Sequence, residues 1–229
     1  MFFAREINNV LIIAAHPDDE VLGCGGSIAR LTSQGSQVKV LFLADGVSAR
    51  GSTDTRELQH RHKAAKEAAG YLGIAHVDFD VFPDNQLDTV PLLSIIKKIE
   101  EEIITYQPDT VFTHHAGDLN IDHQLVHQAV VTACRPQPNH PVKTLLFFEI
   151  PSSTEWQSPH SAPIFAPNWF MDISETLTIK LQALEAYDEE MRAFPHPRSP
   201  KAIETLAHWR GATVGVAAAE AFMLGRQIL

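Results

Sequence analysis

Histidine and carboxylate side chains follow the first apolar segment of the chain at close spacing. After residues 10–13 (VLII) come His16, Asp18, Asp19 and Glu20, within the run AAHPDDE. Imidazole and carboxylate groups together suit zinc or a similar divalent ion, and ligands usually bind where the strands of an open α/β sheet end. Acidic residues here are also typical of a polar turn that begins a helix. The run therefore indicates a metal site only if further ligands exist elsewhere in the chain.

A second polar run supplies those ligands. Residues 113–123 read THHAGDLNIDH, and residues 121–134 have helical periodicity, so His123 stands at the start of a helix that follows another strand. In a Rossmann-like sheet with strand order 3-2-1-4-5, the first and fourth strands are neighbours, and the loops after them face one crevice. We expect His16, Asp19 and His123 to meet there.

The helices and strands that must position these residues alternate along the chain. Strands are indicated at 10–15, 38–43, 77–79, 110–113, 145–148 and 170–173. Helices are indicated at 21–33, 55–72, 92–106, 121–134, 176–191 and 200–211. This alternation predicts an α/β fold with a Rossmann-like, mostly parallel sheet flanked by helices. Residues 151–167, rich in Pro and Ser, predict a long loop that forms the rim of the pocket.

Length and composition indicate one enzyme-sized domain. A chain of 229 residues, 45% of them hydrophobic, can bury a sizeable core, so we expect a single domain over 1–229. Cys24 and Cys134 are far apart and belong to no CxxC pair. They predict reduced thiols in the core rather than a disulfide framework.

Charge and hydropathy exclude two classes of partner. The formal net charge of −10 argues against a general nucleic-acid binder, because no stripe of Lys and Arg is available to replace phosphate counterions. No apolar run is long enough to span a membrane. Residues 1–6 lack the charged leader and the long apolar region of a secretory signal. We therefore expect a cytoplasmic protein without a membrane span.

Three motifs together resemble those of the PIG-L/LmbE-like zinc-dependent N-deacetylases. They are HPDDE at 16–20, NIDH at 120–123, and the C-terminal segment from Arg210–Gly211 to AEAF at 219–222. The resemblance covers essentially the whole chain. It implies a Rossmann-like fold, a zinc ion (or another divalent ion) held by two His and one Asp, and hydrolysis of an acetamide on a small amino-sugar substrate. It also makes a homo-oligomer an expectation.

The resemblance implies a role for each residue of the first two motifs. His16, Asp19 and His123 correspond to the metal ligands, and Asp18 corresponds to the general base. The chemistry agrees, because three protein ligands leave a coordination position for water and a nearby carboxylate can carry the proton. Glu20 is expected to begin the helix or to hydrogen-bond a ligand.

One position departs from the family pattern. Many members carry His three residues before the second-motif ligand, as a cationic partner of the oxyanion, and this chain has Asn120, which donates a hydrogen bond but carries no charge. We expect residues 194–199 (FPHPRS) to supply the missing group, with His196 acting on the oxyanion and Arg198 contacting the substrate. The alternative is a plain linker between two helices.

Further polar residues are candidates for substrate contact. Residues 45–50 line the substrate site by resemblance, which gives Arg50 that role, although an ordinary turn explains them equally well. Asp84 follows Pro83 in a segment that also fits a turn, and Asn120 is a further candidate for substrate binding. The neighbours His114 and His115 end the fourth strand, so one is expected to point into the crevice and the other away.

These observations favour an N-deacetylase acting on an N-acetylated amino sugar or a conjugate of one. One alternative is an amidase that cleaves a thiol or peptide conjugate with the same metal. Another is an inactive, metal-containing sugar-binding protein, for which Asn120 is the only indication.

The glycines at 23–26 lack the GxGxxG spacing of a nucleotide-binding loop, and we expect them to permit close packing of a helix on the sheet.

Overall fold

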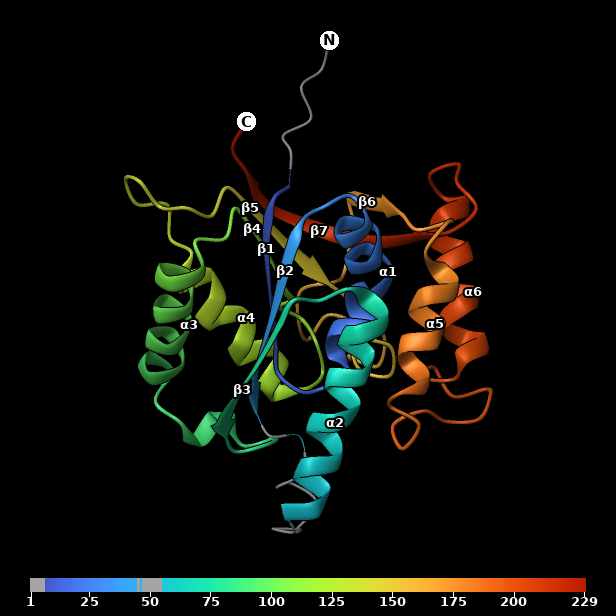
Figure 1. Cartoon of the computed structure of the whole chain (residues 1–229), viewed down its shortest axis with the longest axis horizontal. Helices are drawn as coiled ribbons and strands as arrows, with labels where there is room; N and C mark the ends of the chain where they lie inside the picture. The colour runs from blue at the N-terminus through green and yellow to red at the C-terminus, as the bar shows by residue number, and fades with distance from the viewer. Residues whose placement is uncertain (1–6, 45, 47–54) are drawn as a thin grey trace.

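The computed structural model describes residues 7–44, 46 and 55–229 of the chain (Figure 1). Seven strands in these residues form one sheet: β1 (Asn9–Ala14), β2 (Gln37–Ala44), β3 (His76–Phe82), β4 (Thr110–His114), β5 (Thr144–Phe148), β6 (Trp169–Asp172) and β7 (Ala219–Gln227). The α-helices in these residues are α1 (Asp19–Ser33), α2 (Thr55–Leu72), α3 (Leu92–Tyr106), α4 (Ile121–Ala133), α5 (Leu177–Glu185) and α6 (Pro200–Ala212).

The strand order of the sheet is β3-β2-β1-β4-β5-β7-β6. Strands β1 to β5 are parallel to one another, whereas β7 is antiparallel to both β5 and β6. The predicted order 3-2-1-4-5 and the mostly parallel α/β fold are therefore confirmed. Because β1 lies between β2 and β4, the order reverses at this strand, and a crevice is expected at the carboxyl ends of β1 and β4.

The sequence did not predict β7. Its residues read AEAFMLGRQ, and the pairing of β5 with β7 shifts in register opposite Gly225. Gly225 is the extra residue of a β-bulge. A Cβ atom there would lie 2.7 Å from the Phe147 ring, so glycine is required by close approach. A glycine inside a strand, with polar residues after it, interrupts the run of apolar residues by which a strand is recognised in a sequence.

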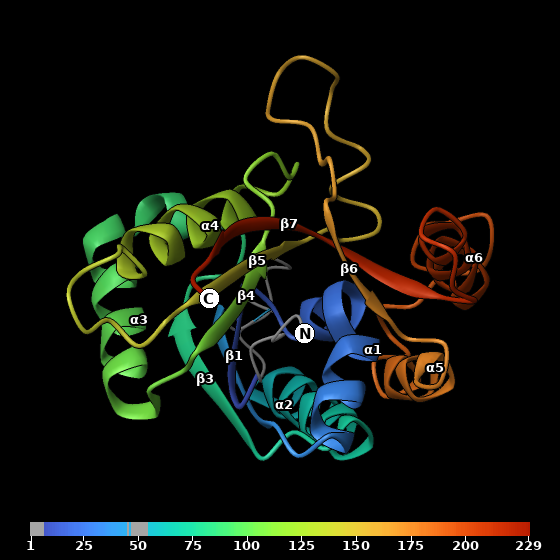
Figure 2. The ribbon, with the colours of Figure 1, turned by 90° about the horizontal axis from the view of Figure 1, so that it is seen from above.

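Helices cover both faces of the sheet (Figure 2). Along β1, Val10, Ile12 and Ala14 pack in one core with residues of α1, α2 and α5, while Leu11 and Ile13 pack in a second core with residues of α3 and α4. A strand buried on both faces is apolar at every position, which is why β1 was recognisable from its sequence. This rigid strand carries the first polar motif at its end.

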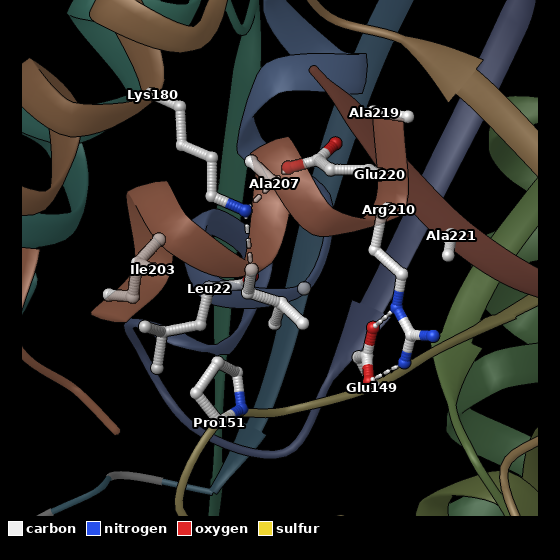
Figure 3. Close-up of a pocket in the computed structure, with 12 residues that line it drawn as sticks. Leu22, Glu149, Pro151, Lys180, Ile203, Ala207, Arg210, Ala219, Glu220 and Ala221 are labelled. Carbon is white, nitrogen blue, oxygen red and sulfur yellow. Dashed lines mark hydrogen bonds and ion pairs between the residues drawn. The ribbon is translucent and has the colours of Figure 1, made fainter. Parts of the chain in front are cut away.

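Helix α1 is broken at Cys24, where φ is −148° and ψ is 21°. A buried ion pair lies against the break (Figure 3). Lys180 of α5 donates to the Leu22 carbonyl at 2.9 Å and to Glu220 Oε1 at 2.6 Å. The two Glu220 oxygens accept the backbone N–H groups of residues 26–27 at 3.0 and 2.7 Å. The pair thus satisfies a carbonyl before the break and two N–H groups after it.

The glycines beside this break lie against neighbouring side chains. A Cβ atom on Gly23 would be 2.6 Å from the Phe148 ring, and one on Gly26 would be 2.8 Å from Ile173 Cδ1. Phe148 belongs to β5 and Ile173 follows β6. The expectation that the glycines of 23–26 permit close helix packing is confirmed.

Two further expectations concern the core and the membrane. Cys24 and Cys134 are buried free thiols, as expected. Among the described residues, no helix has both the length and the apolar character that a membrane crossing requires.

Candidate active site

The polar motifs meet at the carboxyl ends of β1 and β4. His16 follows β1, Asp19 is the first residue of α1, and His123 lies in the first turn of α4, which follows β4. All three side chains are buried. The crevice predicted from the strand order therefore brings together the three residues predicted to bind a metal.

The geometry of these three residues fits a metal ion. Asp19 Oδ2 lies 3.4 Å from His16 Nδ1 and 3.4 Å from His123 Nε2, and one ligand atom from each residue lies within 4.8 Å of the others. Tetrahedral bonds of roughly 2.0–2.1 Å to zinc place ligand atoms roughly 3.3 Å apart. Asp19 Oδ1 and His123 Nε2 are buried without a hydrogen-bond partner in the described part of the chain. Buried polar atoms of this kind are expected to have a partner, and a cation would supply it.

Each histidine has a carboxylate at its other ring nitrogen. His16 Nε2 lies 3.0 Å from Asp122 Oδ2 and 3.1 Å from Asp84 Oδ1, and His123 Nδ1 lies 3.0 Å from Asp118 Oδ1. Metal-binding histidines usually donate the second ring N–H to such a group, which fixes the ring and makes it a better ligand. The arrangement is therefore one that could hold a metal ion.

The carboxylates behind the histidines are themselves fixed. Asp122 accepts the backbone N–H groups of Asn85 at 2.7 Å and Leu87 at 3.0 Å. Asp118 accepts the hydroxyl groups of Ser153 and Thr154. Sequence reasoning did not assign roles to Asp118 and Asp122, although both belong to the run DLNIDH. The available signal was their position within five residues of a predicted ligand.

Asp18 and Asp19 are adjacent but point to different partners. Asp19 faces the histidines, whereas Asp18 Oδ2 accepts a hydrogen bond from Arg198 Nη1 at 2.8 Å. Burial raises the pKa of the Asp18 carboxyl to about 6, although the Arg198 guanidinium acts in the opposite direction. A carboxylate with a pKa close to neutral is suited to proton transfer. Asp18 thus has a pKa suited to proton transfer and lies next to the candidate ligands in the sequence.

A cavity of about 220 Å³ opens beside these residues. It is lined by His16, Asp18, Gly46, Arg61, Asp84, Asn85, Asn120, Glu190 and Arg198. Arg61 Nη1 contacts Glu190 Oε1 at 2.7 Å, and Arg198 Nη1 lies 3.8 Å from Glu190 Oε2. Glu190 was not foreseen, because the pattern predicted a helix over 176–191, whereas α5 ends at Glu185 and turns follow.

The predicted substrate residues have different settings. Asp84, Asn120 and Arg198 line the cavity, whereas Arg50 lies outside the described residues. Asn120 is also the N-cap of α4, because its Oδ1 accepts the Asp122 N–H at 2.8 Å. Its Nδ2 donates to Asn85 Oδ1 at 3.0 Å. Asn120 therefore shapes the cavity wall, and the predicted turn at 84–85 is part of that wall.

His196, predicted to stabilise the oxyanion, is not one of the described residues that line this cavity. Its Nδ1 accepts the Arg198 backbone N–H at 3.1 Å, and its ring meets the edge of Trp156 with centroids 5.5 Å apart. His114, the last residue of β4, and His115, which follows it, diverge as expected. The His114 ring stacks on the His123 ring, with centroids 3.9 Å apart. His115 Nε2 lies 2.9 Å from the Pro163 carbonyl oxygen.

The long loop at 151–167 contacts two residues of the site, Arg198 and Asp118. Ser152 Oγ accepts from Arg198 Nε at 2.8 Å, and the next two residues hold Asp118. The loop also lines a separate cavity of about 290 Å³ that reaches Gly117 and Arg210. The described residues of the loop do not line the cavity beside Asp18, so the predicted rim acts by bracing residues of the site.

Comparison with known families gives the site its context. The family model described as PIG-L, GlcNAc-PI de-N-acetylase, matches residues 11–134, which include all the candidate ligands. The chain belongs to the PIG-L family. It is 32% identical over 190 residues to the uncharacterized deacetylase YaiS of Escherichia coli K12, covering 80% of this chain and 92% of YaiS.

Two further proteins are similar to this chain over most of its length. The diacetylchitobiose deacetylase of Thermococcus kodakarensis is 28% identical over 209 residues, covering 81% of this chain and 71% of that enzyme. The crystal structure of a conserved protein from Thermus thermophilus superposes with a TM-score of 0.75 at 28% identity, covering 96% of each chain. The predicted family resemblance is thus confirmed.

Proposed function

We propose that this PIG-L family member is a metal-dependent hydrolase that removes the acetyl group from an N-acetylated amino sugar or its conjugate. The observation that carries the proposal is the cluster of His16, Asp19 and His123, in which one ligand atom from each buried residue lies within 4.8 Å of the others and Asp18 is the adjacent residue. The family model and the diacetylchitobiose deacetylase relative both concern N-acetylated glucosamine compounds. They support an amino-sugar substrate.

The chemistry needs a polarised carbonyl, a strong nucleophile and a proton for the leaving amine. A zinc or similar divalent ion on His16, Asp19 and His123 would polarise the acetamide carbonyl and lower the pKa of water to about 7. Asp18 takes the proton from the attacking water and returns it to the amine nitrogen. Because Arg198 contacts Asp18 Oδ2, Oδ1 is the oxygen that carries this proton.

The remaining cavity residues bind and orient the sugar. Asp84 and Asn85 can exchange hydrogen bonds with its hydroxyl groups, and Arg61, held by Glu190 at 2.7 Å, places a fixed positive charge at the wall. Arg198 is the positively charged residue that contacts the proposed base, Asp18. His196 keeps the turn at 196–198 in shape through its hydrogen bond to the Arg198 N–H.

Three further parts of the proposal concern the whole chain. Residues 1–229 form a single deacetylase domain, since strands from Asn9 to Gln227 belong to one sheet. Zinc is the proposed native ion, because two imidazoles and one carboxylate form a common catalytic zinc site. A cytoplasmic location fits the two free thiols, Cys24 and Cys134.

The test is release of acetate from defined substrates. Zinc-loaded protein is incubated with N-acetylglucosamine, N,N'-diacetylchitobiose and N-acetylglucosaminyl malate, and both acetate and free amine are quantified. Equal amounts of the two products are expected, and His123→Ala should release neither. An amidase specific for thiol conjugates would release neither acetate nor amine from these substrates, and a sugar-binding protein would bind them without turnover. Either result would overturn the proposal.

A further inference from the structure

The backbone of Asp18 has a conformation that side chains disfavour. Its φ is 119° and its ψ is −28°, in the left-handed half of the map that only glycine enters freely. A residue held there costs free energy and persists only where its surroundings impose it. Asp18 also stands at the N-cap of α1 without using its side chain as a cap, which leaves the carboxylate to face Arg198.

Two buried side chains hold this backbone. The Asp18 N–H donates to Glu20 Oε2 at 3.1 Å, and the Tyr187 hydroxyl donates to Glu20 Oε1 at 2.6 Å. Glu20 and Tyr187 are 1% and 2% exposed, so water cannot easily replace either bond. Tyr187 follows α5 in the turns that also carry Glu190 into the cavity wall.

The conformation matters because two consecutive carboxylates must serve two different partners. Asp19 Oδ2 meets the imidazoles of His16 and His123, while Asp18 Oδ2 meets Arg198. A change in φ at Asp18 would rotate its side chain relative to Asp19, which is fixed by the helix and the histidines. The direction of the base is therefore set by what holds the Asp18 peptide.

We propose that Tyr187, acting through Glu20, is a positioning residue that holds the backbone of Asp18 so that its carboxylate reaches the reacting atoms. This inference rests on the proposed function, in which Asp18 is the base. Tyr187 is not among the residues that line the described cavity, so it acts on the base and not on the substrate. Its removal should lower kcat and leave KM and metal content unchanged.

The experiment compares the kcat and KM of wild type, Tyr187→Phe, Asp18→Asn and the double variant, measured at steady state. Tyr187→Phe keeps the buried ring and removes one hydrogen bond to a carboxylate, so we expect kcat to fall roughly 10- to 100-fold. In the Asp18→Asn background the same change should alter the residual rate by less than about twofold. An equal loss in both backgrounds, or an unchanged kcat, would overturn the proposal.

Tyr106→Phe is the matched control. Tyr106 ends α3, and its hydroxyl is buried without a hydrogen-bond partner among the described residues, so its loss should leave kcat as it is. Zinc content and thermal unfolding are measured for every variant, which separates a positioning effect from loss of the fold.

A second readout does not depend on activity. Crystal structures of wild type and Tyr187→Phe are expected to show a positive φ at Asp18 in the first, and loss of the contact between Asp18 and Arg198 in the second. If the wild type releases no acetate, the proposed function fails, while these structures still decide the positioning role. An Asp18 backbone and an Arg198 contact that are the same in both structures would refute it.

Discussion

Replacement of Asp118 by Asn tests the link between the candidate metal site and the carboxylates behind it. Asp118 Oδ1 lies 3.0 Å from His123 Nδ1, and the same carboxylate accepts the hydroxyl groups of Ser153 and Thr154. Asn has the same shape but no charge, and its amide nitrogen cannot accept a hydroxyl proton. The change therefore weakens the interaction between residue 118 and the His123 ring without removing any proposed ligand.

The size of the effect follows from the role of such groups. Loss of a carboxylate that orients a metal-binding histidine commonly weakens metal affinity by about 10- to 100-fold, which corresponds to about 1.4–2.7 kcal/mol. Asp118 is 0% exposed, so solvent screens the interaction little. We expect the upper part of this range, because Asp118→Asn also loosens the loop at 152–154.

Zinc affinity is measured by competition with a chromophoric chelator at fixed pH and salt. Asp109→Asn is the matched control. The Asp109 carboxylate accepts three hydrogen bonds, from Asn8 N, Asn9 N and Thr110 Oγ1, at the amino ends of β1 and β4, which lie at the opposite edge of the sheet from His16. An Asp118→Asn protein that is folded and binds zinc within about twofold of wild type would refute the reasoning.

Three further outcomes are expected. Asp18→Asn should retain zinc and lose roughly 10²-fold or more in turnover, as for removal of a general base; loss of zinc, measured by elemental analysis, would show that Asp18 is a ligand. Lys180→Met should lower the free energy of unfolding in urea by roughly 3 kcal/mol, because Glu220 is left as a buried carboxylate without its cation, and a loss below roughly 1 kcal/mol would contradict this. Gly26→Ala should cost roughly 1–3 kcal/mol by forcing Ile173 aside, so an unchanged urea midpoint would show that the helix moves at no cost.

The clustering of His16, Asp19 and His123 and the parallel part of the sheet could be predicted because the signals are local. His16 and Asp19 follow an apolar strand directly, and His123 begins a helix after another strand, so the strand order alone brings them together. Strands buried on both faces have continuous apolar sequences. β7 lacks that signal, because Gly225 interrupts it and its pairing with β5 joins segments far apart in the chain.

The partners of the ligands could not be predicted because their roles depend on contacts that are distant in sequence. Asp118 meets residues of the loop at 153–154, and Glu20 meets Tyr187. Neither pair has a spacing rule. The helix expected at 176–191 hid Tyr187 and Glu190, because apolar periodicity continues past Glu185. The backbone instead turns there, so that Glu190 lines the cavity and Tyr187 contacts Glu20. Tertiary contacts decided the end of that helix, as they often do.

The loop at 151–167 contacts both Arg198, which is bonded to Asp18, and Asp118, which lies beside His123. Ser152 contacts Arg198, which holds the base, while Ser153 and Thr154 contact Asp118, which holds a metal-binding histidine. Three consecutive residues therefore brace Asp18, through Arg198, and His123, through Asp118, from outside the cavity beside Asp18. A hydrolysis that needs both groups at one acetamide is sensitive to errors of about 1 Å in their placement. Under the proposed function, a long polar loop at this position would serve the chemistry by bracing these residues, without lining the cavity beside Asp18.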